Sequence, residues 1–124
     1  MIVRVARRGP AGKYEMWSRC RDVDRWPTWM TLVGDVDANG PFRAGLDGSL
    51  VLAGGVRVRF SVIEVDDRGP SWTRELRLGP IRLLVGHQVD EGFGLVTIQA
   101  SGPVAFTYAP FARRSLSRLL KRGD

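Results

Sequence analysis

Apolar and polar residues alternate along most of the chain, in short runs separated by glycine and proline. The separators include Gly54-Gly55, Gly79-Pro80 and Glu91-Gly92, residue pairs that are typical of tight turns. Alternation with a period of two, interrupted by such turns, predicts antiparallel strands joined by short loops. We expect seven strands, at Ile2–Arg7, Thr31–Asp37, Ser49–Ala53, Val56–Asp66, Ser71–Leu78, Ile81–Asp90 and Leu95–Ser101.

Two segments depart from this alternation and predict helices. Residues Ala11–Arg21 are mostly polar, with Tyr14 and Trp17 three positions apart, a spacing that fits a helix lying on another element. A short second helical turn is expected before the second strand. The order of elements is therefore strand, helix, helical turn, six strands and a C-terminal helix, which is an α+β arrangement.

The C-terminal helix is expected within residues Val104–Arg122. Pro110 stands at the start of the half of this segment that has the clearer helical pattern. A proline in the first turn of a helix is tolerated. One helical face carries the apolar residues Ala112, Leu116, Leu119 and Leu120, whereas the basic residues Arg113, Arg114, Arg118, Lys121 and Arg122 fall mostly elsewhere. This is an amphipathic helix with one face to bury.

The turns allow the strands to be paired by keeping apolar residues on one face, since a slip of one residue would invert every side chain. A two-residue turn at Gly79-Pro80 pairs Leu78 with Ile81 and places Trp72 opposite His87. Pairing Asp90 with Leu95, through a four-residue loop, places His87 opposite Ile98. The common face that results is Val58, Phe60, Val62, Glu64, Trp72, Arg74, Leu76, Leu78, Ile81, Leu83, Val85, His87, Val89, Val96, Ile98 and Ala100.

Three ionisable residues, Glu64, Arg74 and His87, lie on this face near Trp72. Buried charges are costly, so such groups are paired, lie at a mouth, or are functional. Pairing Val62 with Leu76 brings Glu64 opposite Arg74, but a bulge at Ile63 would turn Glu64 outward. His87 also fits a hydrogen-bonded core residue, and Trp72 also fits simple packing.

Composition excludes several classes of protein. The chain has 124 residues, one cysteine (Cys20) and one histidine, so it has neither a disulfide framework nor a zinc site of the usual kind, and we expect no metal and no cofactor. The first residues have no apolar signal segment and no stretch is long enough to span a membrane, which favours a cytoplasmic location. The formal charge is +6, but the arginines are spread along the chain, so we expect no nucleic-acid partner.

The segment 11–29, AGKYEMWSRCRDVDRWPTW, resembles the opening of the polyketide cyclase/dehydrase and lipid-transport group of the START-like (SRPBCC, Bet v 1-like) superfamily. Similar matches are Val89-Asp90-Glu91-Gly92 with the following Leu95-Val96-Thr97-Ile98, and Ser101-Gly102-Pro103 before the last helix. The resemblance covers the whole chain as a single domain, 1–124. It implies a helix-grip fold, in which a seven-stranded curved antiparallel sheet wraps around the long C-terminal helix and encloses a cavity.

The resemblance further implies an apolar ligand such as a lipid, a polyketide or an aromatic intermediate. The ligand-binding residues that we predict are Trp72, Trp29, Phe60, Leu76, Val85, Ile98, Tyr108 and Phe111, with Trp29 at the entrance. The tryptophans, Tyr108 and Phe111 also fit sealing of the core. The family has no universal catalytic motif, so no catalytic residue can be carried over from it.

Three functions remain open. In an enzyme for cyclisation or dehydration, His87 would act as general acid or base, Arg74 would hold an oxyanion or a ligand carboxylate, and Glu64 would orient them. A non-catalytic carrier or sensor would use the same cavity without that chemistry. An interaction protein would use the basic surface. The first strand, or an exposed apolar patch, offers a surface for a homodimer.

Overall fold

The computed structural model describes residues 1–100 and 104–121. Within them the strands are β1 (Ile2–Arg8), β2 (Val33–Ala38), β3 (Asp47–Leu52), β4 (Arg57–Asp66), β5 (Ser71–Leu78), β6 (Ile81–Asp90) and β7 (Phe93–Ala100). The helices are α1 (Lys13–Arg21), the 3-10 turn η1 (Val23–Arg25), α2 (Trp26–Trp29) and α3 (Val104–Leu119). These elements follow the predicted order.

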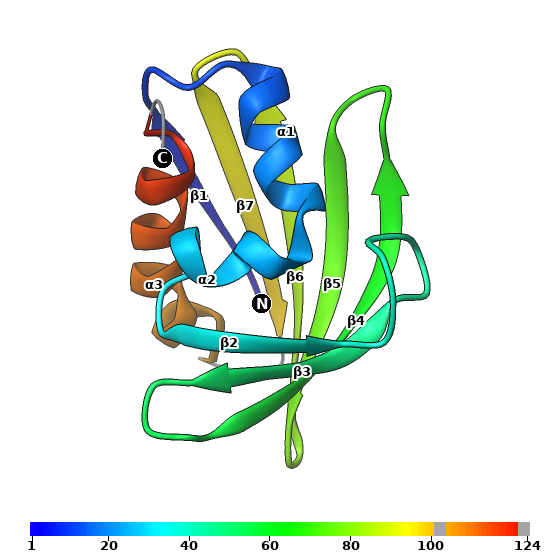
Figure 1. The fold of residues 1–124 in the computed structure, drawn as a ribbon. Helices are drawn as coiled ribbons and strands as arrows, with labels where there is room; N and C mark the ends of the chain where they lie inside the picture. The colour runs from blue at the N-terminus through cyan, green and yellow to red at the C-terminus, as the bar shows by residue number, and fades with distance from the viewer. Residues whose placement is uncertain (101–103, 122–124) are drawn as a thin grey trace.

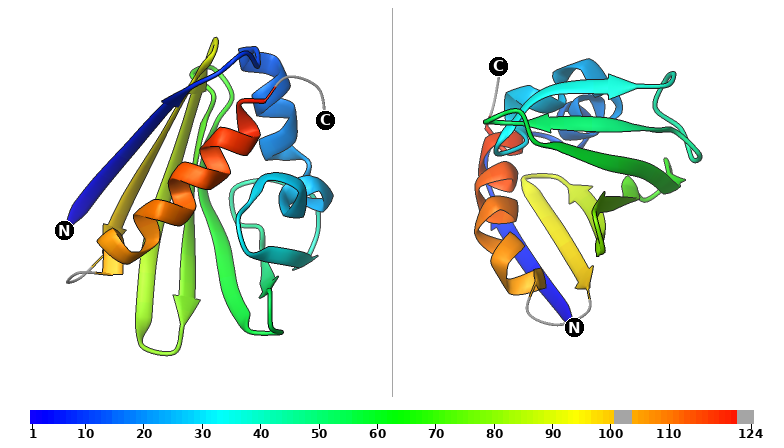
Figure 2. Two further views of the ribbon diagram at one scale, coloured as in Figure 1. Left: turned by 90° about the vertical axis from the view of Figure 1, so that its left-hand side faces the viewer. Right: turned by 90° about the horizontal axis from the view of Figure 1, so that it is seen from below.

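All described strands belong to one antiparallel sheet of seven, in the order β1-β7-β6-β5-β4-β3-β2, with β1 and β2 at its edges (Figure 1). The helix α3 crosses one face of this curved sheet and packs against β1, β7 and α2 (Figure 2). We call this face the inner face and the opposite one the outer face. The architecture is an α+β helix-grip fold, as the sequence predicted.

The hairpin between β5 and β6 confirms the predicted pairing. Leu78 pairs with Ile81 and Trp72 pairs with His87 across the two-residue turn. Gly79 has a φ of +56°, a left-handed conformation that glycine adopts without steric cost. The alternation of side chains therefore places Trp72, Arg74 and Leu76 on the inner face.

The predicted register between β6 and β7 is wrong by two residues. His87 pairs with Val96 rather than with Ile98, because the connection is the two-residue turn Glu91-Gly92 and β7 starts at Phe93. The short turn adds Phe93 and Gly94 to the ladder. A Cβ on Gly94 would lie 2.8 Å from a methyl group of Leu116, so this glycine allows α3 to approach the sheet. A shift of two residues leaves every side chain on its predicted face.

The predicted pairing between β4 and β5 is also wrong, and here the face changes. Phe60 pairs with Leu76 and Val62 pairs with Arg74, after which a bulge shifts the register and Glu64 pairs with Thr73. The bulge at Ile63 was the alternative that the sequence left open. It places Val65 against the core and leaves Glu64 exposed on the outer face, because an apolar side chain gains more from burial there than a carboxylate does.

Several element boundaries differ from the prediction by one or two residues, and the start of β2 and the position of Pro110 are the differences that bear on the site. The strand β2 starts at Val33 rather than at Thr31, because the Thr31 backbone N–H donates to Ser115 Oγ of α3 (2.9 Å) instead of to a strand. The helix α3 already begins at Val104, so Pro110 lies inside it. This proline removes one helical hydrogen bond. Burial of the apolar face offsets the loss, since Ala105, Ala109 and Ala112 are all buried.

The predicted amphipathic pattern of α3 is confirmed for the described residues. Leu116, Leu119 and Leu120 are buried, whereas the basic residues Arg113, Arg114, Arg118 and Lys121 are exposed. Arg122, the predicted strand end at Ser101 and the Gly102-Pro103 pair lie outside the described residues.

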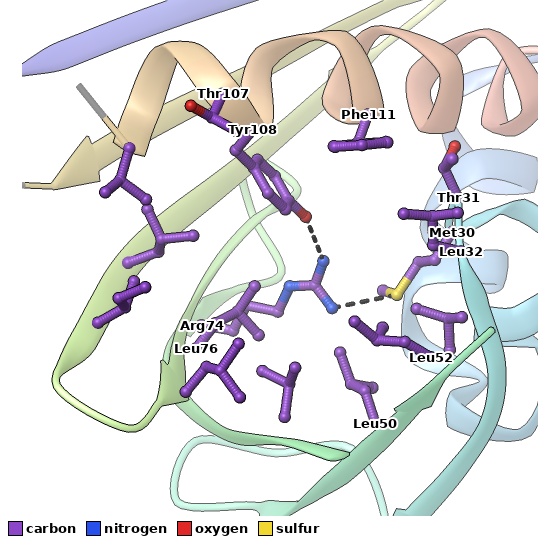
Figure 3. A pocket seen from close by; sticks show the side chains of 16 residues that line it. Met30, Thr31, Leu32, Leu50, Leu52, Arg74, Leu76, Thr107, Tyr108 and Phe111 are labelled. Carbon is purple, nitrogen blue, oxygen red and sulfur yellow. Dashed lines mark hydrogen bonds between the residues drawn. The ribbon is translucent and has the colours of Figure 1, made fainter. Parts of the chain in front are cut away.

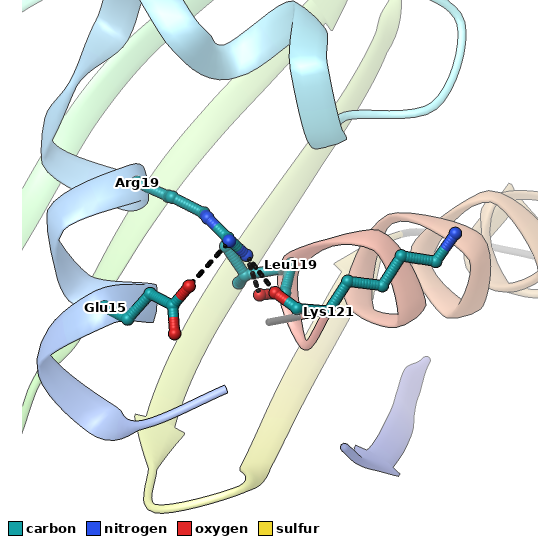
Figure 4. Close-up of polar contacts among 4 residues, drawn as sticks. All are labelled: Glu15, Arg19, Leu119 and Lys121. Carbon is teal, nitrogen blue, oxygen red and sulfur yellow. Dashed lines mark hydrogen bonds and ion pairs between the residues drawn. The ribbon is translucent and has the colours of Figure 1, made fainter. Parts of the chain in front are cut away.

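A buried arginine joins α1 to the C-terminal end of α3. Arg19 Nη1 donates to the carbonyl oxygens of Leu119 and Lys121, both at 2.7 Å, and Nη2 pairs with Glu15 at 2.9 Å (Figure 4). Carbonyls at the end of a helix lack intrahelical donors and carry partial negative charge, so a guanidinium is a well-matched partner. Arg19 therefore closes the end of the molecule opposite to the start of α3.

Candidate functional site

A pocket of about 240 Å³ lies between the inner face of the sheet and the first half of α3 (Figure 3). Its walls come from the segment after α2, from strands β3 to β6 and from α3. Almost all of its lining is apolar. The residues that line it are Met30, Thr31, Leu32, Val33, Leu50, Leu52, Val58, Arg74, Leu76, Leu78, Ile81, Leu83, Val104, Thr107, Tyr108 and Phe111.

The pocket reaches solvent through an apolar rim. Leu32, Leu78 and Ile81 are 45%, 44% and 42% exposed, although all three are large apolar residues. Exposed apolar side chains that border a cavity are typical of a ligand entrance. Leu78 and Ile81 were predicted to face inward, and they do so at the open end of the hairpin rather than in the closed core.

The backbone at the rim is held in an unusual conformation. Leu32 has a φ of +68°, and it is the one non-glycine residue with positive φ in the part of the chain that the structure describes. Its carbonyl accepts a hydrogen bond from the Ala53 backbone N–H at 2.8 Å, which holds the segment against the end of β3. Strained backbone of this kind is often found at ligand sites.

Arg74 is the charged residue of the pocket, and it is only 2% exposed. Its Nη1 donates to Met30 Sδ at 3.1 Å and its Nη2 to Tyr108 Oη at 3.3 Å (Figure 3). The guanidinium carbon also lies 5.7 Å from the ring centre of Trp26 and 5.6 Å from that of Trp72. Among the described residues, no hydrogen-bond partner is found for its Nε.

His87 lies in the core and not at the wall of the pocket. Its ring stacks on Trp72, with ring centres 4.5 Å apart and planes inclined by 10°, and it meets the edge of Trp29. Burial, and then the positive charge of Arg74, hold the pKa of His87 well below its usual range. The imidazole is therefore neutral near pH 7 and does not line the pocket.

The predicted ligand-binding residues separate into two groups. Leu76, Tyr108 and Phe111 line the pocket together with Arg74. The others are buried core residues that do not line it: Trp72, Trp29, Phe60, Val85 and Ile98. The expectation that Trp29 lies at the entrance is wrong, since its indole N–H donates to the Arg19 carbonyl inside the molecule (3.3 Å).

The predicted catalytic residues are not brought together. Arg74 lines the pocket, His87 is separated from it by packing, and Glu64 is exposed on the outer face because of the bulge. The expectation that Glu64 faces Arg74 is thus wrong in its geometry. Burial raises the pKa of Cys20 to about 12, so its thiol is protonated and unreactive.

Sequence reasoning missed the walls contributed by β3 and by the segment Met30–Val33. A signal was present for β3, because pairing Leu50 with Val58 extends the predicted inner face by one strand, as the structure shows. No such signal existed for Met30 and Leu32. Their position depends on hydrogen bonds to α3 and β3, which sequence periodicity does not report.

The described residues contain no grouping of three His, Cys, Asp or Glu side chains that could hold a metal ion. Among the described helices, none is both long and apolar enough to cross a membrane.

Fold and pocket together define a helix-grip protein with a small apolar cavity, and comparison with solved structures supports the fold. XoxI from Bacillus cereus superposes with a TM-score of 0.74 at 15% identity, over 96% of this chain and 92% of that one. A protein from Nitrosospira multiformis gives 0.74 at 16% identity, over 97% and 94%. These similarities concern the fold alone.

A further structural neighbour is DynU16, described as a putative protein in the dynemicin biosynthetic locus. It superposes with a TM-score of 0.67 at 21% identity, over 96% of this chain but only 45% of DynU16. No protein-family description matches the sequence, and no curated protein matches it either.

Proposed function

We propose that this chain is a single helix-grip domain that binds an apolar small molecule in the pocket beneath α3. The observation that carries the proposal is the pocket itself, which is apolar on nearly all sides and opens through Leu32, Leu78 and Ile81. Its polar residues, among the described ones that line it, are one arginine, one tyrosine and two threonines. An apolar cavity with a few converging polar groups is the usual form of a small-molecule site.

Two further observations support this proposal. The sequence resembles the polyketide cyclase/dehydrase and lipid-transport group, whose members take lipids, polyketides or aromatic intermediates. One structural neighbour, DynU16, belongs to a biosynthetic locus. A lipid, a polyketide or an aromatic intermediate is therefore the class of ligand that we propose.

The arrangement of ionisable groups favours a carrier or sensor over a cyclase or dehydratase. Aldol-type cyclisation and dehydration need a proton acceptor beside the substrate. His87, the candidate for this role, does not line the pocket, and neither does Glu64, which was expected to orient the catalytic groups. Arg74 and Tyr108 remain as groups that could stabilise an oxyanion, so binding is the function that the geometry supports best.

The test is the binding of a neutral fluorescent probe. N-phenyl-1-naphthylamine brightens when it enters an apolar site, and we expect saturable 1:1 binding to the wild-type protein. Leu52 is half-buried and lines the pocket, so Leu52→Trp should fill the pocket and weaken probe binding at least tenfold.

The matched control is Ile63→Trp, which adds the same side chain at an exposed position outside the pocket. It should leave probe binding unchanged. If the wild-type protein fails to brighten the probe, or if a folded Leu52→Trp variant binds as tightly as the wild type, the pocket is not the binding site and the proposal is wrong.

A further inference from the structure

Arg74 carries a charge that the described part of the protein does not balance. Arginine stays protonated in proteins, so the guanidinium brings one positive charge to a position where the residue is only 2% exposed. Its partners are a thioether, a neutral hydroxyl and two indole rings. None of these groups is an anion, and the Nε atom has no hydrogen-bond partner in the part of the chain that the structure describes.

The nearest acidic residues on β5 and on the neighbouring strand β4 lie on the outer face, whereas Arg74 lies on the inner face. The bulge in β4 turns Glu64 outward, as described above. Glu75, the neighbour of Arg74 along β5, lies on the outer face and forms ion pairs with Arg77 and Arg82. Within residues 1–100 and 104–121 no carboxylate lies within ion-pairing distance of Arg74.

Burial of an unpaired ion is unfavourable, and the cost is recovered when a counter-ion of good geometry arrives. The guanidinium lies at the wall of an otherwise apolar pocket (Figure 3). A ligand that carries one negative charge would therefore complete the site. Its apolar body would contact Leu50, Leu76 and Leu83, which line the same space.

Tyr108 is placed to bind the same ligand anion as Arg74. Its hydroxyl oxygen accepts from Arg74 Nη2, which leaves the hydroxyl proton free to be donated to a ligand oxygen. One guanidinium and one hydroxyl match the two oxygens of a carboxylate. A phosphate monoester would bring a second charge without a second cation in the pocket.

We propose that the natural ligand is a small apolar monocarboxylate, whose carboxylate pairs with Arg74 and Tyr108 while its body fills the pocket toward the rim at Leu78 and Ile81. This inference rests on the proposed function and specifies the ligand class for the same site. The volume of about 240 Å³ lies below the usual range of drug-sized sites, which limits the enclosed part of the ligand to a short chain or one or two rings.

The test uses matched pairs of acid and alcohol, measured by calorimetry at pH 7.5: octanoate with 1-octanol, and 2-naphthoate with 2-naphthalenemethanol. A pocket that recognises only apolar surface prefers the alcohol, because an ionised carboxylate is costly to dehydrate. We expect the opposite order, with the acid of at least one pair bound tenfold or more tightly than its alcohol.

Variants then assign the preference to Arg74. Arg74→Met should reverse it, Arg74→Lys should keep it in weaker form, and Tyr108→Phe should weaken the acid several-fold without affecting the alcohol. Arg59→Met is the matched control, since it removes the same charge from an exposed position outside the pocket. It should leave the preference unchanged.

The wild-type comparison does not depend on whether any variant folds. If the neutral probe binds but both alcohols bind as tightly as their acids, or if no member of either pair binds, the carboxylate inference is wrong and the proposed function stands. If the probe does not bind either, the proposed function itself fails.

Discussion

His87 shows how a residue with catalytic chemistry can have a packing role. Its imidazole is stacked on Trp72 and touches Trp29 at right angles, and its Nδ1 has no hydrogen-bond partner among the described residues. The nearby guanidinium of Arg74 opposes a second positive charge. The neutral ring is therefore the stable form, and it extends the stack that Trp26 and Trp72 begin.

This state predicts a dependence of stability on pH. The pKa of His87 is lowered in the folded protein, so below pH 6.5 the unfolded chain takes up a proton that the folded one does not. Stability conferred by the neutral form is complete above pH 6.5 and is lost as the pH falls. Between pH 7.5 and 5.5 the wild-type protein should lose about 1.4 kcal/mol more unfolding free energy than His87→Leu.

Urea unfolding at the two pH values measures this difference. The two proteins differ only at position 87, and His87 is the only histidine in the chain, so the difference between them isolates this imidazole. Equal losses in the two proteins would show that the imidazole is protonated in the folded state, which the stacked arrangement does not predict.

At the scale of elements, the buried contact between α1 and the end of α3 is expected to stabilise the fold more than an exposed ion pair does. Arg19 links α1 to the carbonyls that end α3, and it is buried, whereas Arg21 on the same helix faces solvent and pairs with Asp67 at 3.8 Å. Hydrogen bonds between a charged donor and buried carbonyls contribute far more than exposed pairs.

Replacement of these two arginines tests the difference. Arg19→Met should lower the unfolding free energy by about 2–3 kcal/mol, because the carbonyls of Leu119, at the end of α3, and of Lys121, just beyond it, lose their donor. Arg21→Met should change it by less than about 0.5 kcal/mol, as expected for an exposed pair. Denaturant titrations of both variants measure the values, and similar losses would contradict the role given to Arg19.

At the scale of the whole molecule, the sheet is open, with β1 and β2 at its edges. A homodimer through β1 remains a prediction. This edge carries exposed Arg4, Arg7 and Arg8, and charges of this kind discourage pairing between two copies of an edge strand.

Association through β1 should therefore strengthen with salt. Sedimentation at 50 and 500 mM NaCl should show more dimer at the higher concentration, because screening weakens the repulsion between the arginines. A mixture of the wild type with the double variant Arg4→Glu/Arg7→Glu should associate at low salt, where neither protein does so alone. A dimer that is insensitive to salt would use another surface, and a monomer throughout would rule the dimer out.

Much of the fold could be predicted because its determinants are local. Alternation along β5 and β6, with a turn at Gly79-Pro80, was sufficient for the correct register, and the spacing of Leu116 with its neighbours was sufficient for α3. The errors concern turns and bulges. Glu91-Gly92 closes the hairpin where a four-residue loop was predicted, and both connections keep every side chain on the same face, so alternation does not distinguish them.

The candidate site was predicted less well than the fold. Arg74, Tyr108 and Phe111 were named and do line the pocket, but Trp29, Trp72 and His87 pack into the core beside it. An inward-facing residue can lie in the packed core or at the wall of a cavity. Periodicity reports the direction of a side chain and not whether a neighbour occupies the volume in front of it.

The sequence by itself determined the strands, the helices and, away from the bulge in β4, the face on which the strand side chains lie, because these follow from backbone geometry with periods of two and 3.6 residues. Only the tertiary structure decided that a bulge removes Glu64 from Arg74, and that three indole rings fill one end of the fold. Packing among residues distant in the chain sets both outcomes. The result is a cavity at the other end, with the guanidinium of Arg74 in its wall.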